Sequence, residues 1–329
     1  MKEKRYFAAA NTVSGFVSYY HEIFGACEKI YIIKGGSGTG KSRFMRDIAK
    51  YVLNNLPRSL VEYFYCSFDP HSLDGIMIDR RIAVIDGTPP HVYEPMLPGV
   101  KEELVDLGAF WSSKALVEKK NELISLMRRK KAHFERVYRY LSSYGELMAV
   151  VEEHFLSAID HDRLRLGAAK CVSELESNEK GGSIIRTTSA FGRYGLYSLI
   201  DEKIFRGRLG IEHLWLSSII HEAEIFGISA EIAYDPLFRN RPSRVTLGGC
   251  AVFTLENVEI SEYLRSDAYI GSINSDEVAK TADTILDSAA LELSAASSVH
   301  FEIEKIYASA MDFEKKEAFT KEFLNRIEI

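Results

Sequence analysis

The feature that most constrains this chain is a glycine-rich segment, KGGSGTGKS, at residues 34–42. A short run of β-branched and aromatic residues, Ile30–Ile33, comes directly before it and is typical of a buried strand. After it, apolar residues recur at helical spacing as far as Val52, and Pro57 follows shortly afterwards. The pattern therefore predicts a buried strand that runs into a tight loop and then directly into a helix.

The residue types within the loop are specific. Gly35, Gly40, Lys41 and Ser42 satisfy the pattern G-x-x-x-x-G-K-[ST]. Glycines let backbone N–H groups approach phosphate oxygens closely, and the positive end of the following helix faces the same anion. We expect Lys41 to reach the β and γ oxygens and the Ser42 hydroxyl to bind magnesium; a glycine-rich turn that matches by chance is the alternative. The predicted nucleotide-binding residues are Gly35, Gly36, Ser37, Gly38, Thr39, Gly40, Lys41, Ser42 and Arg43.

Two further strands are predicted at Leu60–Cys66 and Arg81–Ile85, and the second of them is followed by Asp86. A carboxylate at the carboxyl end of a buried parallel strand lies where ligands bind in open α/β sheets. Asp86 is therefore the candidate to hold magnesium directly or through water, and an ordinary Asp-Gly turn is the alternative. Gly87 follows it, so the acidic pair of motor-type ATPases is missing, which lowers the expected rate of hydrolysis.

A polar, turn-rich segment at residues 67–75 is predicted to form a loop at the same edge of the sheet. In small-molecule kinases, a carboxylate in this place often acts as a general base. Asp69 or Asp74 is the candidate here, and an Asp-Pro turn that only shapes the loop is the alternative. His91 lies in the next, proline-rich loop and is a candidate to contact the γ-phosphate or else an ordinary surface residue.

The second half of the chain resembles a degraded repeat of the first. Tyr65–Pro70 is echoed by Ala233–Pro236, and a predicted strand at Ala251–Leu255 matches Arg81–Ile85, at an offset of about 166–174 residues. The segment Ile204–His213, which falls opposite the glycine loop, has lost the lysine and the serine. We therefore expect the second unit to keep the fold without a standard nucleotide site. One arginine of this region is a candidate to reach the γ-phosphate of the first site, and surface salt bridges are the alternative. The arginines concerned are Arg206, Arg208, Arg239, Arg241 and Arg244.

Each half is predicted to end in helices, at about 112–178 and about 275–327, with apolar residues at near-heptad spacing. The first of these regions is basic, whereas residues 256–329 are acidic. Complementary charge favours packing of the two regions on each other within one chain or between subunits. Nucleic-acid binding is disfavoured because aromatic residues are sparse in the basic stretch and the net charge is −6.

The length and composition agree with this organisation. A chain of 329 residues exceeds the size at which single cores stop growing, about 250–300 residues, so two domains are expected. The apolar share of 46% is typical of a globular protein, and no apolar run approaches the ~18 residues of a membrane span. The 4 cysteines are widely separated, without the spacing of a metal site. We expect a cytoplasmic protein with no membrane partner.

Three segments, KGGSGTGKS, YCSFDPHSLDG and RIAVIDGTPPHVYEP, together resemble a bacterial family of duplicated P-loop ATPases. The resemblance covers nearly the whole chain. It implies an α/β fold of tandem P-loop NTPase-like units with mostly parallel sheets, each followed by long helices. The corresponding domains are 1–180 and a degenerate 181–329. It also implies binding of ATP with Mg²⁺ at Gly35–Ser42, and the preference for ATP over GTP rests on the resemblance alone.

These observations predict a slow, Mg²⁺-dependent ATPase with one competent site, in which Lys41, Asp86 and Asp69 are the candidate catalytic residues. One alternative is a phosphotransferase of the small-molecule or nucleoside kinase type, with Asp69 or Asp74 as the base. Another is a nucleotide-gated scaffold in which ATP orders a partner surface without turnover. A protein partner or a second copy of the chain would then bind through the helical regions.

Overall fold

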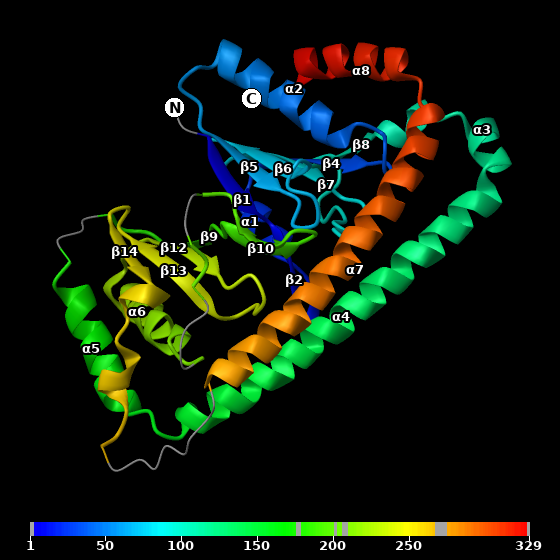
Figure 1. Ribbon diagram of the computed structural model, residues 1–329. Coiled ribbons are helices and arrows are strands. Elements are labelled where there is room, and N and C mark those ends of the chain that lie inside the picture. Colours follow the sequence, from blue (N-terminus) through cyan, green and yellow to red (C-terminus); the bar gives the residue numbers. More distant parts are fainter. Residues whose placement is uncertain (1–2, 176–178, 201–202, 206–209, 267–274, 328–329) are drawn as a thin grey trace. The chain divides into compact units, whose positions relative to one another are not determined.

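The computed structural model describes residues 3–175, 179–200, 203–205, 210–266 and 275–327. Its contacts define two compact units, each assembled from separate stretches of the chain (Figure 1). The first comprises Met1–Ala9, Ser18–Val137 and Leu291–Ile329, and the second comprises Ala10–Val17 and Tyr138–Ala290. This division differs from the expected boundary after residue 180, because the helices α4 (Lys120–Leu156) and α7 (Ser275–Ser309) each contribute residues to both units.

The first unit is built on a six-stranded sheet in the order β1-β5-β6-β7-β4-β8 (Figure 1). Its strands are β1 (Lys4–Phe7), β4 (Lys29–Lys34), β5 (Val61–Tyr65), β6 (Leu73–Ile78), β7 (Ile82–Asp86) and β8 (Glu102–Asp106). The strand β4 lies between β7 and β8 and runs parallel to both. It is buried along most of its length, which explains its continuous apolar sequence. The predicted strands are confirmed, with ends shifted by a residue or two.

The strand β6 corrects the sequence analysis, which assigned residues 67–75 to a loop. A tight turn, in which Ser72 N donates to Asp69 O at 3.0 Å, returns the chain so that β6 pairs antiparallel with both β5 and β7. The sequence did not reveal this strand, because Asp74 and Gly75 interrupt the apolar residues of β6. The expectation of mostly parallel sheets is thus too simple, because the sheet is mixed.

Helices cover this sheet and join distant parts of the sequence. They are α1 (Tyr20–Phe24), α2 (Lys41–Asn55), the 3₁₀ helix η1 (Leu107–Phe110), α3 (Ser113–Glu118) and α8 (Phe313–Arg326), with parts of α4 and α7. The helix α8 lies beside α2, where the ring of Phe323 is 5.1 Å from that of Phe44 (Figure 1). Phe323 also lies 5.1 Å from Tyr31 of β4. The end of the chain thereby packs on the strand and the helix that flank the glycine loop.

The second unit has a smaller, mostly antiparallel sheet, which again differs from the expected parallel arrangement. Its order is β14-β13-β12-β9, and only β9 and β12 are parallel. These strands are β9 (Ser183–Ile185), β12 (Ala230–Tyr234), β13 (Pro242–Leu247) and β14 (Ala251–Thr254). Two hairpins pair β2 (Ala9–Thr12) with β3 (Gly15–Ser18) and β10 (Ser189–Gly192) with β11 (Gly195–Ser198).

The helices of this unit include α5 (His161–Ser173) and α6 (His213–Phe226), together with the 3₁₀ turns η2 (Leu255–Asn257) and η3 (Ile260–Tyr263). Leu216 and Ile219 of α6 pack with Val245 and Leu247 of β13 in the core. Burial of one helix face against the sheet is the usual layer arrangement of an α/β unit.

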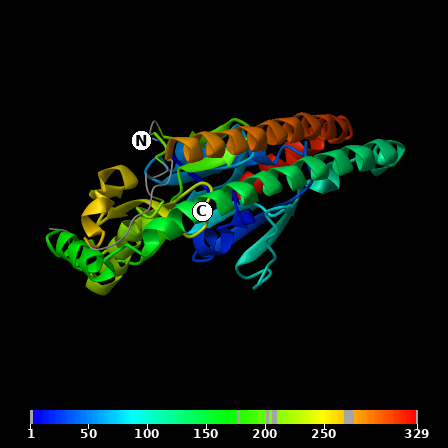
Figure 2. The ribbon, with the colours of Figure 1, turned by 60° about the horizontal axis from the view of Figure 1, so that its bottom comes forward.

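The long helices expected in both halves are confirmed. Within the first unit, α4 and α7 lie side by side through a core of Leu123, Leu126, Val299 and Ile303 (Figures 1 and 2). The expected charge complementarity occurs within the chain, since Arg136 of α4 forms a 2.8 Å ion pair with Glu292 of α7. In the described part of the chain, none of the helices is both long enough and apolar enough to cross a bilayer.

The anchoring of α8 leads to a first prediction. Phe323 is 0% exposed, so Phe323→Ala should lower the unfolding free energy of the first unit by about 3–5 kcal/mol through the cavity that it leaves. The measurement is urea unfolding in a Trp215→Phe background, where Trp111 of the first unit is the remaining tryptophan, because the chain contains 2. Phe313→Ala on the same helix is the control, since Phe313 is 48% exposed. An equal effect of both substitutions would contradict the role of α8.

Candidate functional site

The glycine loop between β4 and α2 has a conformation that side chains would prevent. Gly38 and Gly40 both have φ of 77°, in the left-handed region that favours glycine. A Cβ atom on Gly38 would also lie 2.6 Å from the Glu304 carbonyl oxygen and 2.9 Å from the Ala308 nitrogen. Glycine at this position is therefore required twice, by the backbone conformation and by the close approach of α7.

Lys41 joins the loop to the neighbouring strand. Its Nζ donates hydrogen bonds of 2.9 Å to the carbonyl oxygens of Gly35 and Gly36, and lies 3.4 Å from Asp86 Oδ2. Thr39 is buried, and its hydroxyl donates to Gly36 O at 2.9 Å. The loop thus folds around the ammonium group of Lys41, beside the carboxylate that the sequence analysis singled out.

Asp86 and Ser42 are the residues that would hold magnesium. Asp86 is the last residue of β7, and its partner in the parallel pairing is Ile33, just before the loop. Its Oδ1 accepts hydrogen bonds from Thr88 N at 2.9 Å and from Thr88 Oγ1 at 2.6 Å. Ser42 Oγ accepts from Leu73 N at 3.0 Å. A hydroxyl and a carboxylate oxygen are ligands that Mg²⁺ prefers.

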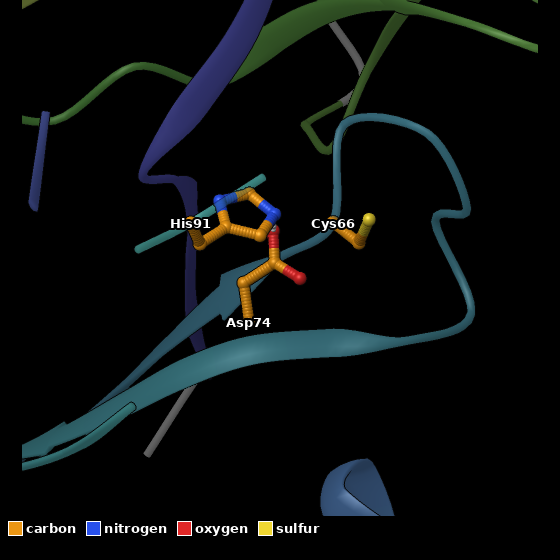
Figure 3. Close-up of side chains that lie close together, drawn as sticks. All are labelled: Cys66, Asp74 and His91. Atoms are coloured by element: carbon orange, nitrogen blue, oxygen red, sulfur yellow. Dashed lines mark ion pairs between the residues drawn. The ribbon is translucent and has the colours of Figure 1, made fainter. Parts of the chain in front are cut away.

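A second group of side chains lies at the same edge of the sheet, directly after β5, on β6 and on the loop after β7. Cys66, Asp74 and His91 each offer an atom within 4.8 Å of the others (Figure 3). Asp74 Oδ2 lies 3.2 Å from His91 Nε2, and both side chains are buried. The group can exchange protons, and its atoms are close enough to share a divalent cation. The sequence analysis did not single out Cys66, because a cysteine far from the others in the sequence carries no spacing signal.

Burial governs the chemistry of Asp74. It raises the pKa of the carboxyl group to about 6, against the opposing effect of His91, and the nearby charge of Asp86 raises it further. Tyr20 holds this group in place, because its ring stacks on His91 at 5.2 Å and its hydroxyl donates to Asp74 O at 3.1 Å. Asp74 is therefore able to give or accept a proton near neutral pH.

Asp69 has a different environment. Its carboxylate accepts hydrogen bonds from His71 N at 3.2 Å and from Ser72 Oγ at 3.1 Å, within its own turn. This geometry matches the shaping of an Asp-Pro turn, the alternative considered for Asp69. The other candidate base, Asp74, is affected by both residues of the predicted site: Asp86 raises the pKa of its carboxyl group and Lys41 lowers it.

The remaining predicted residues are two residues of the glycine loop and its helix, and the arginines of the second half of the chain. Ser37 lies half-buried in the loop, and Arg43 is exposed in the first turn of α2. Arg206 and Arg208 lie outside the described residues. In the second unit, Arg241 forms an ion pair with Glu152 and lies 3.8 Å from the centre of the Phe238 ring. Arg241 thus has the salt-bridge role that was the alternative to phosphate binding.

Several residues near the loop were missed because they belong to distant helices. Lys130 of α4 and His300 of α7 both interact electrostatically with Lys41. Lys316 of α8 is buried, and its Nζ would lie 3.6 Å from a Cβ atom on Gly40. The sequence showed these helices only as apolar stripes, in which a lysine has no distinguishing spacing.

Comparisons of the chain with protein-family models, with characterised proteins and with solved structures each found no match. The functional argument therefore depends on the residues and geometry described above.

The environment of Asp74 predicts a pH-dependent stability. Since the folded pKa is raised from 3.8 to about 6, the folded state binds more protons than the unfolded state between these values, and stability is lost as pH rises through this window. Asp74→Asn removes that loss. The unfolding free energy of the variant, relative to that of the wild type, should rise by about 2 kcal/mol between pH 4 and pH 7.

Urea unfolding at a series of pH values measures this difference. Asp162→Asn, at an exposed position on α5, controls for general effects of pH on the chain. A difference between Asp74→Asn and wild type that stays constant with pH would show that burial does not control this carboxyl group.

Proposed function

We propose that the first unit binds ATP with Mg²⁺ at Gly35–Ser42 and hydrolyses it slowly. The observation that carries this proposal is the position of Lys41, which is held by two loop carbonyl groups and lies 3.4 Å from Asp86. The glycine loop, Lys41, the N-terminus of α2, and the Ser42 and Asp86 oxygens that we assign to magnesium support the proposal, because polyphosphate binding uses this combination. The preference for ATP over GTP still depends on the family resemblance.

The geometry around Gly87 supports slow turnover. A Cβ atom on Gly87 would lie 2.3 Å from Ile32 Cγ2, so a second acidic side chain has no room directly after Asp86. The attacking water therefore needs another base. Asp74, paired with His91 in the adjacent cluster, is the residue that we assign to this role.

Phosphoryl transfer to a small acceptor is the second candidate function. Asp74 is favoured over Asp69 as the base of that reaction, because its carboxyl group is buried and its pKa is raised to about 6. The two functions differ in whether an acceptor other than water is needed. A scaffold that binds ATP without turnover remains the third proposal, and a partner would contact the helical regions in that case.

We also propose that the chain contains tandem P-loop NTPase-like units, of which the second is a degenerate copy. In support, β1-β5-β6-β7 and β9-β12-β13-β14 follow the same order, with one parallel and two antiparallel pairings in each. The register shifts between Phe64 and Tyr65 on β5, and again between Ala233 and Tyr234 on β12. Tyr65 and Tyr234 thus occupy equivalent places at the register shift, although the Asp-Pro motif follows Tyr65 after three residues and Tyr234 directly. The wide separation of the 4 cysteines along the sequence supports the proposed cytoplasmic location.

Removal of the loop lysine tests ATP binding. Lys41→Ala should weaken the affinity for MgATP by about 10- to 100-fold, because a charge-assisted contact to phosphate contributes about 1.5–3 kcal/mol. Titration calorimetry measures this affinity, and Lys50→Ala, at an exposed position on the same helix, is the control. Unchanged ATP affinity in Lys41→Ala would refute the proposed nucleotide site.

Acceptor dependence separates hydrolysis from transfer. We expect the wild type to release phosphate from MgATP without any added acceptor, and Asp74→Asn to slow this release by about 10²- to 10⁴-fold through loss of the base. Asp69→Asn is the matched control and should retain most of the activity. ADP formation that requires an added nucleoside or metabolite would instead favour the phosphotransferase, and tight ATP binding without turnover would favour the scaffold.

A further inference from the structure

The helices α4 and α7 bring charge to the loop from outside the sheet. Within the first unit, α7 packs against the loop so closely that its backbone would lie 2.6 Å from a Cβ atom on Gly38. One turn earlier on α7 lies His300, which faces Lys130 of α4. Lys130 Nζ lies 3.0 Å from His300 Nδ1. The helix pair therefore presents a lysine–histidine pair from elements that lie outside the glycine-rich sequence pattern of the loop.

Aromatic side chains hold this pair at the carboxyl edge of the sheet. Lys130 Nζ lies 5.8 Å from the ring centre of Phe68, which follows β5, and 5.9 Å from that of Phe134 on its own helix. The rings of Phe68 and Phe134 are 5.3 Å apart, and Phe68 also contacts His300 edge-on at 5.9 Å. The edge after β5 is the same edge that carries Asp74, next to Lys41 and Asp86.

The electrostatics of the pair indicate an excess of positive charge. Burial lowers the pKa of Lys130, and the charge of Lys41 lowers it further, against the opposing effect of Cys66. Burial lowers the pKa of His300, and the positive charges of Lys130 and Lys41 lower it further, to about 4. Among the described residues, no carboxylate forms an ion pair with Lys130. Two lysines that repel each other in a partly buried site are stabilised when an anion binds between them.

We propose that Lys130 contacts the terminal phosphate of the bound nucleoside triphosphate and that His300 is its positioning residue. This inference rests on the nucleotide site proposed above and deepens it. His300 accepts a hydrogen bond from the lysine and holds its ammonium group toward the loop. A triphosphate gains this contact and a diphosphate does not, so the helix pair distinguishes the two. Lys130 thereby supplies the stabilising cation that the sequence analysis had sought among the arginines of the second half.

The experiment measures the affinities for a non-hydrolysable MgATP analogue and for MgADP, with Trp111 fluorescence as the signal. The ring of Trp111 would lie 3.2 Å from a Cβ atom on Gly36, so it reports on the loop. Lys130→Met is the principal variant, because methionine keeps an apolar stem against Phe68 and Phe134. We expect its preference for the triphosphate over the diphosphate to fall about 10- to 100-fold, with little change in ADP affinity.

Two further variants separate positioning from packing. Lys131→Ala, at the exposed neighbouring position, should behave as the wild type. His300→Ala should lower the triphosphate preference, and His300→Asn, which retains an acceptor, should restore most of it. A merely structural role for His300 would change folding stability in both variants without this selective rescue.

Each outcome has a definite meaning. An equal loss of ATP and ADP affinity in Lys130→Met, or a triphosphate preference equal to that of the wild type, overturns the role of Lys130 while the nucleotide site stands. Absence of nucleotide binding by the wild type itself overturns the proposed function, and this inference with it. Loss of both affinities in Lys41→Ala, together with loss of triphosphate preference alone in Lys130→Met, supports both proposals.

Discussion

The parallel pairing of β4 with β7 is the constraint on which the candidate site depends. It sets Ile33 opposite Asp86, so the strand that enters the glycine loop ends beside the strand that ends in a carboxylate. The glycine loop that follows β4 then returns Lys41 to the same edge, where its Nζ lies 3.4 Å from Asp86 Oδ2. A shift of one residue in this register would direct Asp86 to the opposite face of the sheet and separate the two charges.

The loop is also shaped by the end of the chain. The helix α7 approaches Gly38 so closely that no side chain fits there, and α8 packs Phe323 against both α2 and β4. Residues from opposite ends of the sequence therefore share one core around one loop. A movement of α7 would displace the loop backbone directly, so the proposed nucleotide binding and the position of this long helix are physically coupled.

The strand β6 shows where sequence reasoning reached its limit. Asp74 and Gly75 read as parts of a polar loop, yet both lie in a buried strand between β5 and β7. Asp74 is tolerated there because His91 lies 3.2 Å away and because protonation relieves its charge as the pH falls. A buried ionisable group lowers folding stability, and such groups are concentrated at functional sites. These sites are therefore the places where the local sequence pattern and the tertiary structure disagree.

The sequence by itself determined the strand, loop and helix around Gly35–Ser42, because glycine spacing and apolar periodicity are local properties of the chain. It also assigned Asp86 and Lys41 to one predicted nucleotide site, since buried parallel strands end at a common edge. Only the tertiary structure decided that Asp74 joins His91 and Cys66, and that Lys130 meets His300 beside Lys41. Those groups are separated along the chain by up to 170 residues, as for Lys130 and His300. Asp74 reaches its partners through the antiparallel pairing of β6. Lys130 and His300 meet through packing between helices, for which an apolar stripe specifies a buried face but not the partner that it contacts.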